Sequence, residues 1–224
     1  YGNAIGVSAF GKYGAEAENS GTVFADAYLG RANALYALSL QGDALVVNSG
    51  TASAYSYDSA AFAAYAASIL ADASVDNSGT LLASSYNSTA IGAAAITNYG
   101  TALVSNSGDI SVDARVSTAV GAFARGDYAE IDNTGSISAV GVQAFGAYAI
   151  GTYAASIGNG GSISAESANG VAVAAAIFSY AGDASLDNSG DLSAYTFDGV
   201  AAGAYVVGYN SATVVNSGTI TGIA

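Results

Sequence analysis

The sequence contains no proline, cysteine, methionine, tryptophan or histidine. Without His and Cys it lacks the usual base–nucleophile pairs of enzymes and the ligands of most zinc sites. No apolar run is long enough for a membrane helix, because Gly, Asn and Asp interrupt every run. The absence of Pro suits a protein built from backbone ladders, since Pro cannot donate to them. We therefore expect a protein that is not an enzyme.

Positive charge is also scarce. Four basic residues, Lys12, Arg31, Arg115 and Arg125, stand against seventeen acidic ones, which gives a net charge of −13. Phosphates would be repelled, so we expect no nucleic-acid partner. Apolar residues nevertheless make up 52% of the chain, with small side chains prominent among them. A bias of this kind is typical of a repetitive structure that packs small residues and stays soluble through its acidity.

A corner phrase, Asn-x-Gly, recurs eight times at spacings of 26 to 29 residues. Its asparagines are Asn19, Asn48, Asn77, Asn106, Asn133, Asn159, Asn188 and Asn216. Its glycines are Gly21, Gly50, Gly79, Gly108, Gly135, Gly161, Gly190 and Gly218. Because the phase is kept throughout, we predict one continuous domain over residues 1–224, with eight repeats and no linker.

Apolar residues alternate on both sides of each corner. Ala always lies four residues before the Asn, and further apolar positions lie two before, four after and, with one Gly, six after it. Period two is the strand signature, so each corner joins two strands. A third extended segment must close the circuit. In the third repeat this segment lies in Ala60–Ala73, whose composition favours helix, so a helical turn stays possible there.

Stacking these repeats gives every strand a parallel partner and buries a continuous core. We predict an all-β, single-chain parallel β-solenoid (β-helix) of about eight rungs of 26–29 residues. At a strand spacing of roughly 4.8 Å, the rod would be about 38 Å long. Asn and Gly suit the corners because both tolerate left-handed backbone angles. The stacked Asn amides are expected to bond to one another in a ladder.

The corner phrase resembles the repeats in β-helical passenger domains of bacterial autotransporters and related large adhesins. The best examples are Val75–Ala83, Ile131–Ala139 and Leu186–Ala194. The resemblance covers the whole chain and implies display at the bacterial cell surface or outside the cell. A weaker resemblance, at Ser88–Gly92 and Gly141–Gly151, is to head repeats of trimeric autotransporter adhesins, which remain an alternative.

Tyr is the abundant residue best suited to recognition. One column lies five to eight residues before the corner Asn: Tyr13, Tyr99, Tyr128, Tyr153, Tyr180 and Tyr209. Two further columns lie eleven to twelve residues before it and seven to nine residues after it. Stacked rings would stabilise the rod, and exposed rings would bind glycans or another surface. No cofactor and no metal site is expected, because the nonapeptides of calcium-binding β-rolls are absent. Calcium binding by the acids before alternate corners, Glu18, Asp76, Asp132 and Asp187, stays an alternative.

Two roles follow from the repeat count. Across a junction between two copies, the Asn-to-Asn distance would be 27 residues, inside the internal range. The expected partners are therefore copies of the chain stacked end to end as a fibre, or flanking repeats of a longer adhesin. The alternative is an adhesin module that uses its tyrosine columns to bind glycans or abiotic surfaces.

Overall fold

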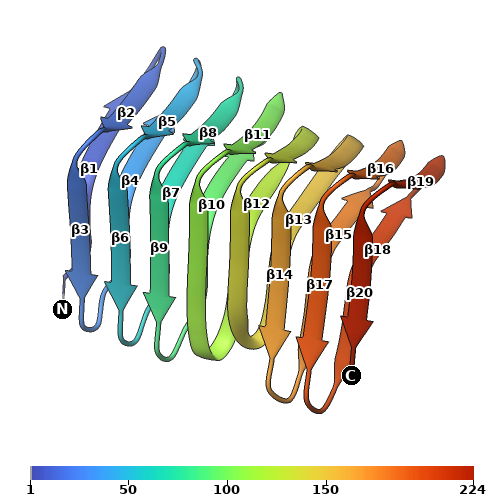
Figure 1. The fold of residues 1–224 in the computed structure, drawn as a ribbon. Coiled ribbons are helices and arrows are strands. Elements are labelled where there is room, and N and C mark those ends of the chain that lie inside the picture. The colour runs from blue at the N-terminus through green and yellow to red at the C-terminus, as the bar shows by residue number, and fades with distance from the viewer. Residues whose placement is uncertain (1) are drawn as a thin grey trace.

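The computed structural model describes residues 2–224 as a single parallel β-solenoid of eight rungs (Figure 1). Each rung has three straight sides, and every strand pairs in parallel with its equivalents one rung before and after, apart from those at the two ends. The predicted fold class is confirmed. One chain closes each circuit, so three chains are not needed to build a rung, as they would be in a trimeric head.

The three sides form three sheets. The long sheet contains β1 (Ala4–Gly11), β4 (Ala32–Ser39), β7 (Ala61–Ser68), β10 (Ala90–Thr97), β15 (Val171–Ser179) and β18 (Val200–Gly208). The short sheet contains β2 (Ala15–Asn19), β5 (Ala44–Asn48), β8 (Ala73–Asn77), β11 (Thr101–Asn106), β16 (Asp183–Asn188) and β19 (Ser211–Asn216). The front sheet contains β3 (Thr22–Ala27), β6 (Thr51–Ser56), β9 (Thr80–Ser85), β14 (Ser162–Ser167), β17 (Asp191–Thr196) and β20 (Thr219–Ile223).

Two long strands complete rungs 4 to 6. β12 (Asp109–Asn133) and β13 (Ser136–Asn159) each run as one strand from the front sheet through the long sheet to the short sheet, and the pairing of the two shifts register at the bends, between Ala114 and Thr118 and between Gly126 and Tyr128. We call the bend between long and short sheets the tip, the bend between short and front sheets the Asn corner, and the bend between front and long sheets the lower bend. In Figure 1 the front strands run down, the long strands behind them run up, and rungs advance from left to right. The coil is therefore right-handed, as connections between parallel strands nearly always are.

The third segment is extended throughout. Ala61–Ser68 forms β7, and no residue from 2 to 224 is helical, so the described chain has no helix that could cross a membrane. The helical preference of Ala is overridden here because the segment, as a strand, forms backbone hydrogen bonds with a strand on each side. An isolated helical turn would leave the backbone groups of those two strands unpaired. Ala also suits the interior, where its small side chain lets opposite sheets approach.

Backbone angles at the corners differ from the sequence-based expectation. Among residues 2–224, positive φ occurs only at Gly100 and Gly199, and at no residue other than Gly. Left-handed backbone is therefore the wrong explanation for the corner Asn and Gly. The glycines are required for steric reasons, because a Cβ on Gly108 would overlap the carbonyl oxygen of Gly79 in the rung before it.

The core is a set of columns whose sizes are matched within each rung. In five rungs a Gly of the long sheet faces a β-branched side chain of the front sheet, as Gly146 faces Ile163. The five glycines are Gly6, Gly92, Gly121, Gly146 and Gly203. In the remaining rungs the equivalent long-sheet residue is Ala and its front-sheet partner is Ala or Leu, as with Ala174 and Leu192 in rung 7. A larger side chain on the front sheet is thus matched by a smaller residue on the long sheet, so the interior is filled in every rung.

This size match gives a rescue experiment. Gly146→Ala should destabilise the protein by about 1–3 kcal/mol, because the new Cβ would meet Cγ2 of Ile163. Adding Ile163→Leu gives rung 6 the Ala–Leu pair of rung 7 and should recover part of that loss. Urea unfolding of the wild type, both single variants and the double variant measures the coupling. A double variant as unstable as the sum of the single effects would refute the size match.

Candidate functional site

The Asn corner holds a continuous ladder of side-chain amides. Nδ2 of each asparagine donates to Oδ1 of the asparagine one rung further on, at 2.7–2.8 Å in all seven links. The same Nδ2 also donates to the carbonyl of the Gly two residues on, as Asn106 does to Gly108 at 3.0 Å. The ladder predicted for these eight residues is present, and it supports the corner motif of the fold.

The ladder has a direction. Every link runs with the donor in the earlier rung and the acceptor in the later rung. At the first rung, Oδ1 of Asn19 accepts from the backbone N–H of Gly21 and from no earlier asparagine amide. At the last rung, Nδ2 of Asn216 donates to the carbonyl of Gly218 and to no later asparagine. One end thus presents an acceptor and the other a donor.

Buried hydroxyls close the other two bends, and the sequence reading missed them. At the lower bend the hydroxyl of Ser56 donates to the carbonyl of Gly30 at 2.8 Å and accepts from the N–H of Ser59. At the tip Ser68 bonds in the same way to Gly42 and Ala71. Ser or Thr recurs at these two phases in several repeats, and this was the signal that could have revealed them.

The tyrosine column predicted from the sequence lies along the tip. Its six side chains are 52% to 77% exposed. Tyr128 and Tyr153 contact each other, with ring centroids 6.1 Å apart and planes tilted by 44°. The other four, Tyr13, Tyr99, Tyr180 and Tyr209, have no ring partner within residues 2–224. Stacking in this column is therefore limited to one pair.

Stacking is stronger at the lower bend. Tyr28, Tyr57 and Tyr86 form a stack with centroids 5.0 Å apart and planes within 8° of parallel. The guanidinium of Arg115 lies 5.9 Å from the Tyr86 ring and continues the stack into the next rung. Offset stacks of this kind contribute about 0.5–1.5 kcal/mol per pair. These rings belong to the third tyrosine column and stabilise the first rungs.

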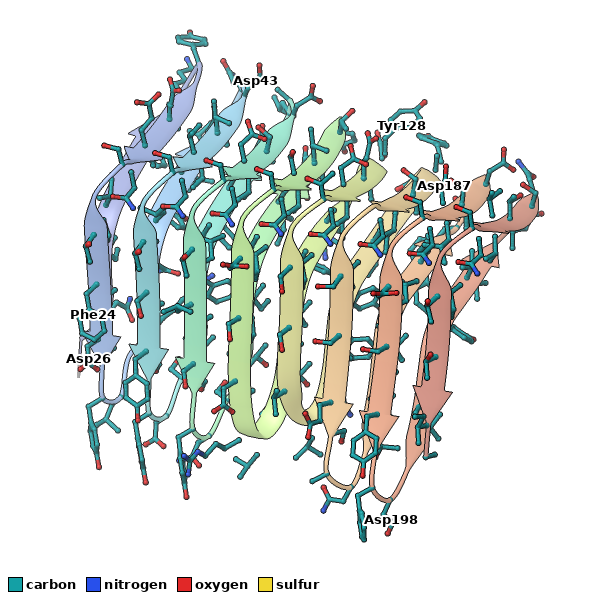
Figure 2. All side chains as sticks on the ribbon, in the orientation of Figure 1. Phe24, Asp26, Asp43, Tyr128, Asp187 and Asp198 are labelled. Atoms are coloured by element: carbon teal, nitrogen blue, oxygen red, sulfur yellow. The ribbon has the colours of Figure 1, made fainter. Side chains whose placement is uncertain are left out.

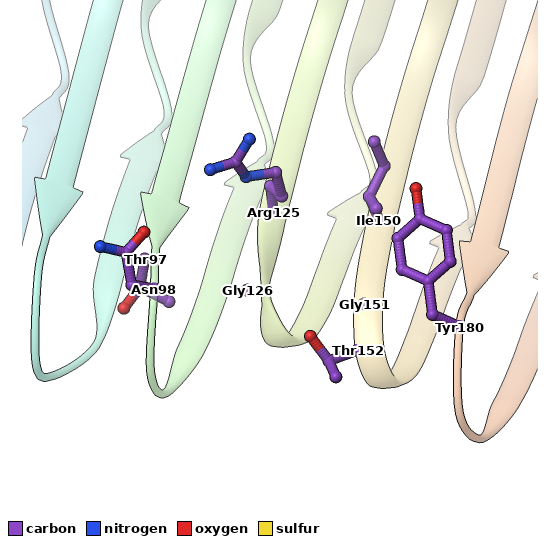
Figure 3. A pocket seen from close by; sticks show the side chains of 8 residues that line it. All are labelled: Thr97, Asn98, Arg125, Gly126, Ile150, Gly151, Thr152 and Tyr180. Carbon is purple, nitrogen blue, oxygen red and sulfur yellow. The ribbon is translucent and has the colours of Figure 1, made fainter.

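A recess interrupts the tip where the bend is short. Four residues join Ser39 to Ala44, but two join Gly126 to Ala129 and three join Gly151 to Ala155. Rungs 5 and 6 therefore lie back from their neighbours and leave a space of about 330 Å³. Figure 3 shows the side chains around it. They are Thr97, Asn98, Arg125, Ile150, Thr152 and Tyr180, with the backbone of Gly126 and Gly151. The recess combines the Arg125 cation, the Asn98 amide, the Thr152 hydroxyl and Tyr180 of the predicted column, whereas the Thr97 hydroxyl is buried and donates to the carbonyl of Ala71.

The carboxylates are dispersed along the rod. Among residues 2–224 no group of three or more acids is close enough to hold a metal ion. Burial raises the pKa of Glu130 above its ordinary value, and the nearby Asp132 raises it further. This pair lies on the outer side of the short sheet and follows the repeat. Burial likewise raises the pKa of Tyr36 and Tyr148, which keeps these phenols uncharged.

These features define a class: a right-handed parallel β-helix held by an internal amide ladder, with solvent-facing rings along its bends. A family model described as the BigA third pectate lyase-like domain matches residues 12–222, and the chain belongs to this family. No curated protein and no solved structure matches the chain. The resemblance to the β-helical repeat region of a surface protein is confirmed at this level.

Proposed function

We propose that this chain is an extracellular structural rod, a β-solenoid module of a bacterial surface adhesin or filament, and not an enzyme. Its family is named for BigA, a bacterial surface protein, which supports a surface β-helical module. The dispersed carboxylates and the absence of His and Cys support a non-catalytic role. We retain as part of this proposal a single domain over residues 1–224 and an autotransporter-type route to the surface.

The polarity of the amide ladder carries the proposal. Nδ2 of Asn216 and Oδ1 of Asn19 are complementary, so a further rung at either end would continue the ladder in the same direction. The strands of the last rung also present unpaired edges, and all residues of β19 are exposed. Such edges favour addition of parallel strands, either from flanking repeats or from another copy of the chain. Identical head-to-tail contacts generate an open fibre.

Gly21 offers a direct test of stacking between copies. A Cβ at Gly21 meets nothing closer than Oδ1 of Asn19, at 4.0 Å, because no rung of this chain lies before it. In a stack, Gly21 would face Gly218 of the preceding copy, as Gly218 faces Gly190 here, and a Cβ would then overlap that carbonyl oxygen. Gly21→Ala should leave melting of the single rod unchanged and raise the concentration needed for fibres at least about tenfold, the equivalent of 1.4 kcal/mol.

Electron microscopy and light scattering of the 224-residue chain measure this. Gly160→Ala is the control, because the nearest atom to a Cβ there is Oγ of Ser189 at 3.7 Å, and it should form fibres as the wild type does. Fibres formed equally well by Gly21→Ala would refute this mode of stacking. Wild-type chains that remain soluble monomers of about 38 Å, eight strand spacings, would favour flanking repeats of a longer adhesin.

The glycan-binding alternative is favoured by the recess in Figure 3. Tyr180 and Arg125 line it together with hydroxyl and amide groups, which are the polar groups and rings that sugars contact. The tyrosine column itself offers separated rings in place of a continuous platform. Binding of glycans or abiotic surfaces by Tyr13, Tyr99, Tyr128, Tyr153, Tyr180 and Tyr209 remains a prediction.

A further inference from the structure

The long sheet carries no carboxylate. Its strands and the equivalent parts of β12 and β13 cover residues 4–11, 32–39, 61–68, 90–97, 118–126, 143–151, 171–179 and 200–208. None of the seventeen acidic residues falls within these ranges, and Arg125 is the one charged residue that does. The acids lie on the other two sheets and at the bends. Figure 2 shows Asp43 at the tip, Asp187 beside the Asn corner and Asp198 at the lower bend.

The outer side of this sheet is instead apolar and aromatic. Because of an irregularity in every rung, Phe62 and Tyr65 point outward together although two residues, Ala63 and Ala64, lie between them, and their rings make an edge contact at 5.3 Å. Phe145 and Tyr148 occupy the same two positions in rung 6, where their rings are stacked at 5.2 Å. Ring contacts then connect successive rungs, from Tyr148 to Phe178 and from Phe178 to Tyr205. Most of these rings are half-buried, and the guanidinium of Arg31 covers the first pair, 4.1 Å from the ring centroid of Phe62 and 5.1 Å from that of Tyr65.

The area of this surface matches that of a stable interface. The outward side chains of each strand span six residues, as from Phe62 to Ala67 in β7, and eight rungs stack along the rod, so the surface measures about 20 Å by 38 Å at standard strand dimensions. Two such surfaces in contact would bury about 1,500 Å² in total, which is the size of a typical specific complex. Most soluble proteins leave no apolar patch of this size uncovered.

We propose that two copies of the chain pack long sheet against long sheet as an isologous pair. Isologous contact needs a surface that is complementary to itself, and this surface meets the requirement because its mixed aromatic and aliphatic columns carry no carboxylate and two cations, Arg31 over the rings of rung 3 and Arg125 in rung 5. The other two sheets are excluded as self-contacts, since each carries outward carboxylates that would face their own copies. A basic partner would bind those acidic sheets. Aligned sheets would lie about 10 Å apart, with their side chains interdigitated.

Tyr148→Glu tests the pair, because it places a carboxylate at the centre of the surface, in contact with Phe123, Phe145 and Phe178. All proteins carry Gly21→Ala, so that end-to-end stacking does not add to the mass. Sedimentation should show the parent at twice the 21.7 kDa chain mass. Tyr148→Glu should sediment as a monomer, with dimer association weakened at least about 100-fold, because an isologous contact would bury the new charge of both copies. Leu82→Glu, an apolar exposed residue of the front sheet whose neighbours in the adjacent rungs are Ser53 and Ser111, is the matched control and should remain a dimer.

Circular dichroism and melting should be alike for both charged variants, which separates loss of pairing from loss of folding. A second measurement uses the absence of natural cysteine. Ala67→Cys on the long sheet should be crosslinked between copies by a short bis-maleimide, whereas Ser193→Cys on the front sheet should not. A parent that is monomeric at millimolar concentration, or a Tyr148→Glu variant that stays dimeric, overturns the proposal. Flotation of a monomeric parent with phosphatidylcholine vesicles would also overturn it, by assigning the surface to a lipid membrane.

Discussion

Replacing Asn106, an interior residue of the amide ladder, by Asp should strongly destabilise the rod. Nδ2 of Asn106 donates to Oδ1 of Asn133 at 2.8 Å, to the carbonyl of Gly108 at 3.0 Å and to that of Ser136 at 3.4 Å. A carboxylate oxygen in this place would face three acceptors. The side chain is 1% exposed, so water cannot replace the lost partners. We expect a loss of about 3–5 kcal/mol.

Asn216→Asp is the matched control. Its amide donates only to the carbonyl of Gly218, and the residue is exposed at the last rung. The same substitution there should cost about 1 kcal/mol or less. Thermal and urea unfolding of both variants measure the difference. Equal destabilisation would mean that the interior of the ladder contributes no more than its end.

The effect at Asn106 should depend on pH. Burial and neighbouring acceptors would raise the pKa of the new carboxyl above its unfolded value of about 3.9. The folded protein then binds the proton more tightly, so the destabilisation is complete above the folded pKa and shrinks as the pH falls toward about 4. Part of it should remain, because a carboxylic acid donates one hydrogen where the amide donates two. A deficit independent of pH would contradict a buried charge as its cause.

Replacing Gly108 by Ala should be similarly severe. The added Cβ would approach the carbonyl of Gly79 and the backbone of Ser78 closer than 3.0 Å, which real Cβ atoms essentially never do. Backbone on both sides is fixed by the ladder and by the strands, so neither rung can shift without losing hydrogen bonds. We expect a loss of about 3 kcal/mol or more, which lowers Tm by about 6–12 °C for a chain of this size.

Gly21→Ala supplies the control for this change because it alters the same corner position with no rung before it. A surface change of this kind alters the free energy of unfolding by about 0.5 kcal/mol or less. The melting temperature of Gly21→Ala should therefore stay within about 2 °C of the wild type. Melting curves of the two variants at low protein concentration, where copies do not stack, give the comparison. If Gly108→Ala proved as stable as Gly21→Ala, close backbone approach would not be the reason for the corner glycine.

The sequence by itself determined the repeat, the strands beside each Asn and the amide ladder. Positions with period two and a fixed Asn phase can be read without coordinates, since each rung faces a copy of itself and similar residues must pack on similar residues. The matching of Gly146 to Ile163 could not be read, because it joins two sheets whose facing residues are set by the closure of the third side. The corner glycine was identified correctly but for the wrong reason, since close approach between rungs shows only when rungs are stacked.

The tertiary structure alone decided the handedness, the recess and the assignment of side chains to sheets. The sequence contains the acid-free segments, yet their meaning depends on their joining into one outer surface. The recess beside Arg125 depends on bends that are one or two residues shorter than their neighbours, which matters only when rungs lie against each other. Periodicity is a local property that the chain records directly, whereas surfaces are made by residues about 28 positions apart, and only folding brings these together.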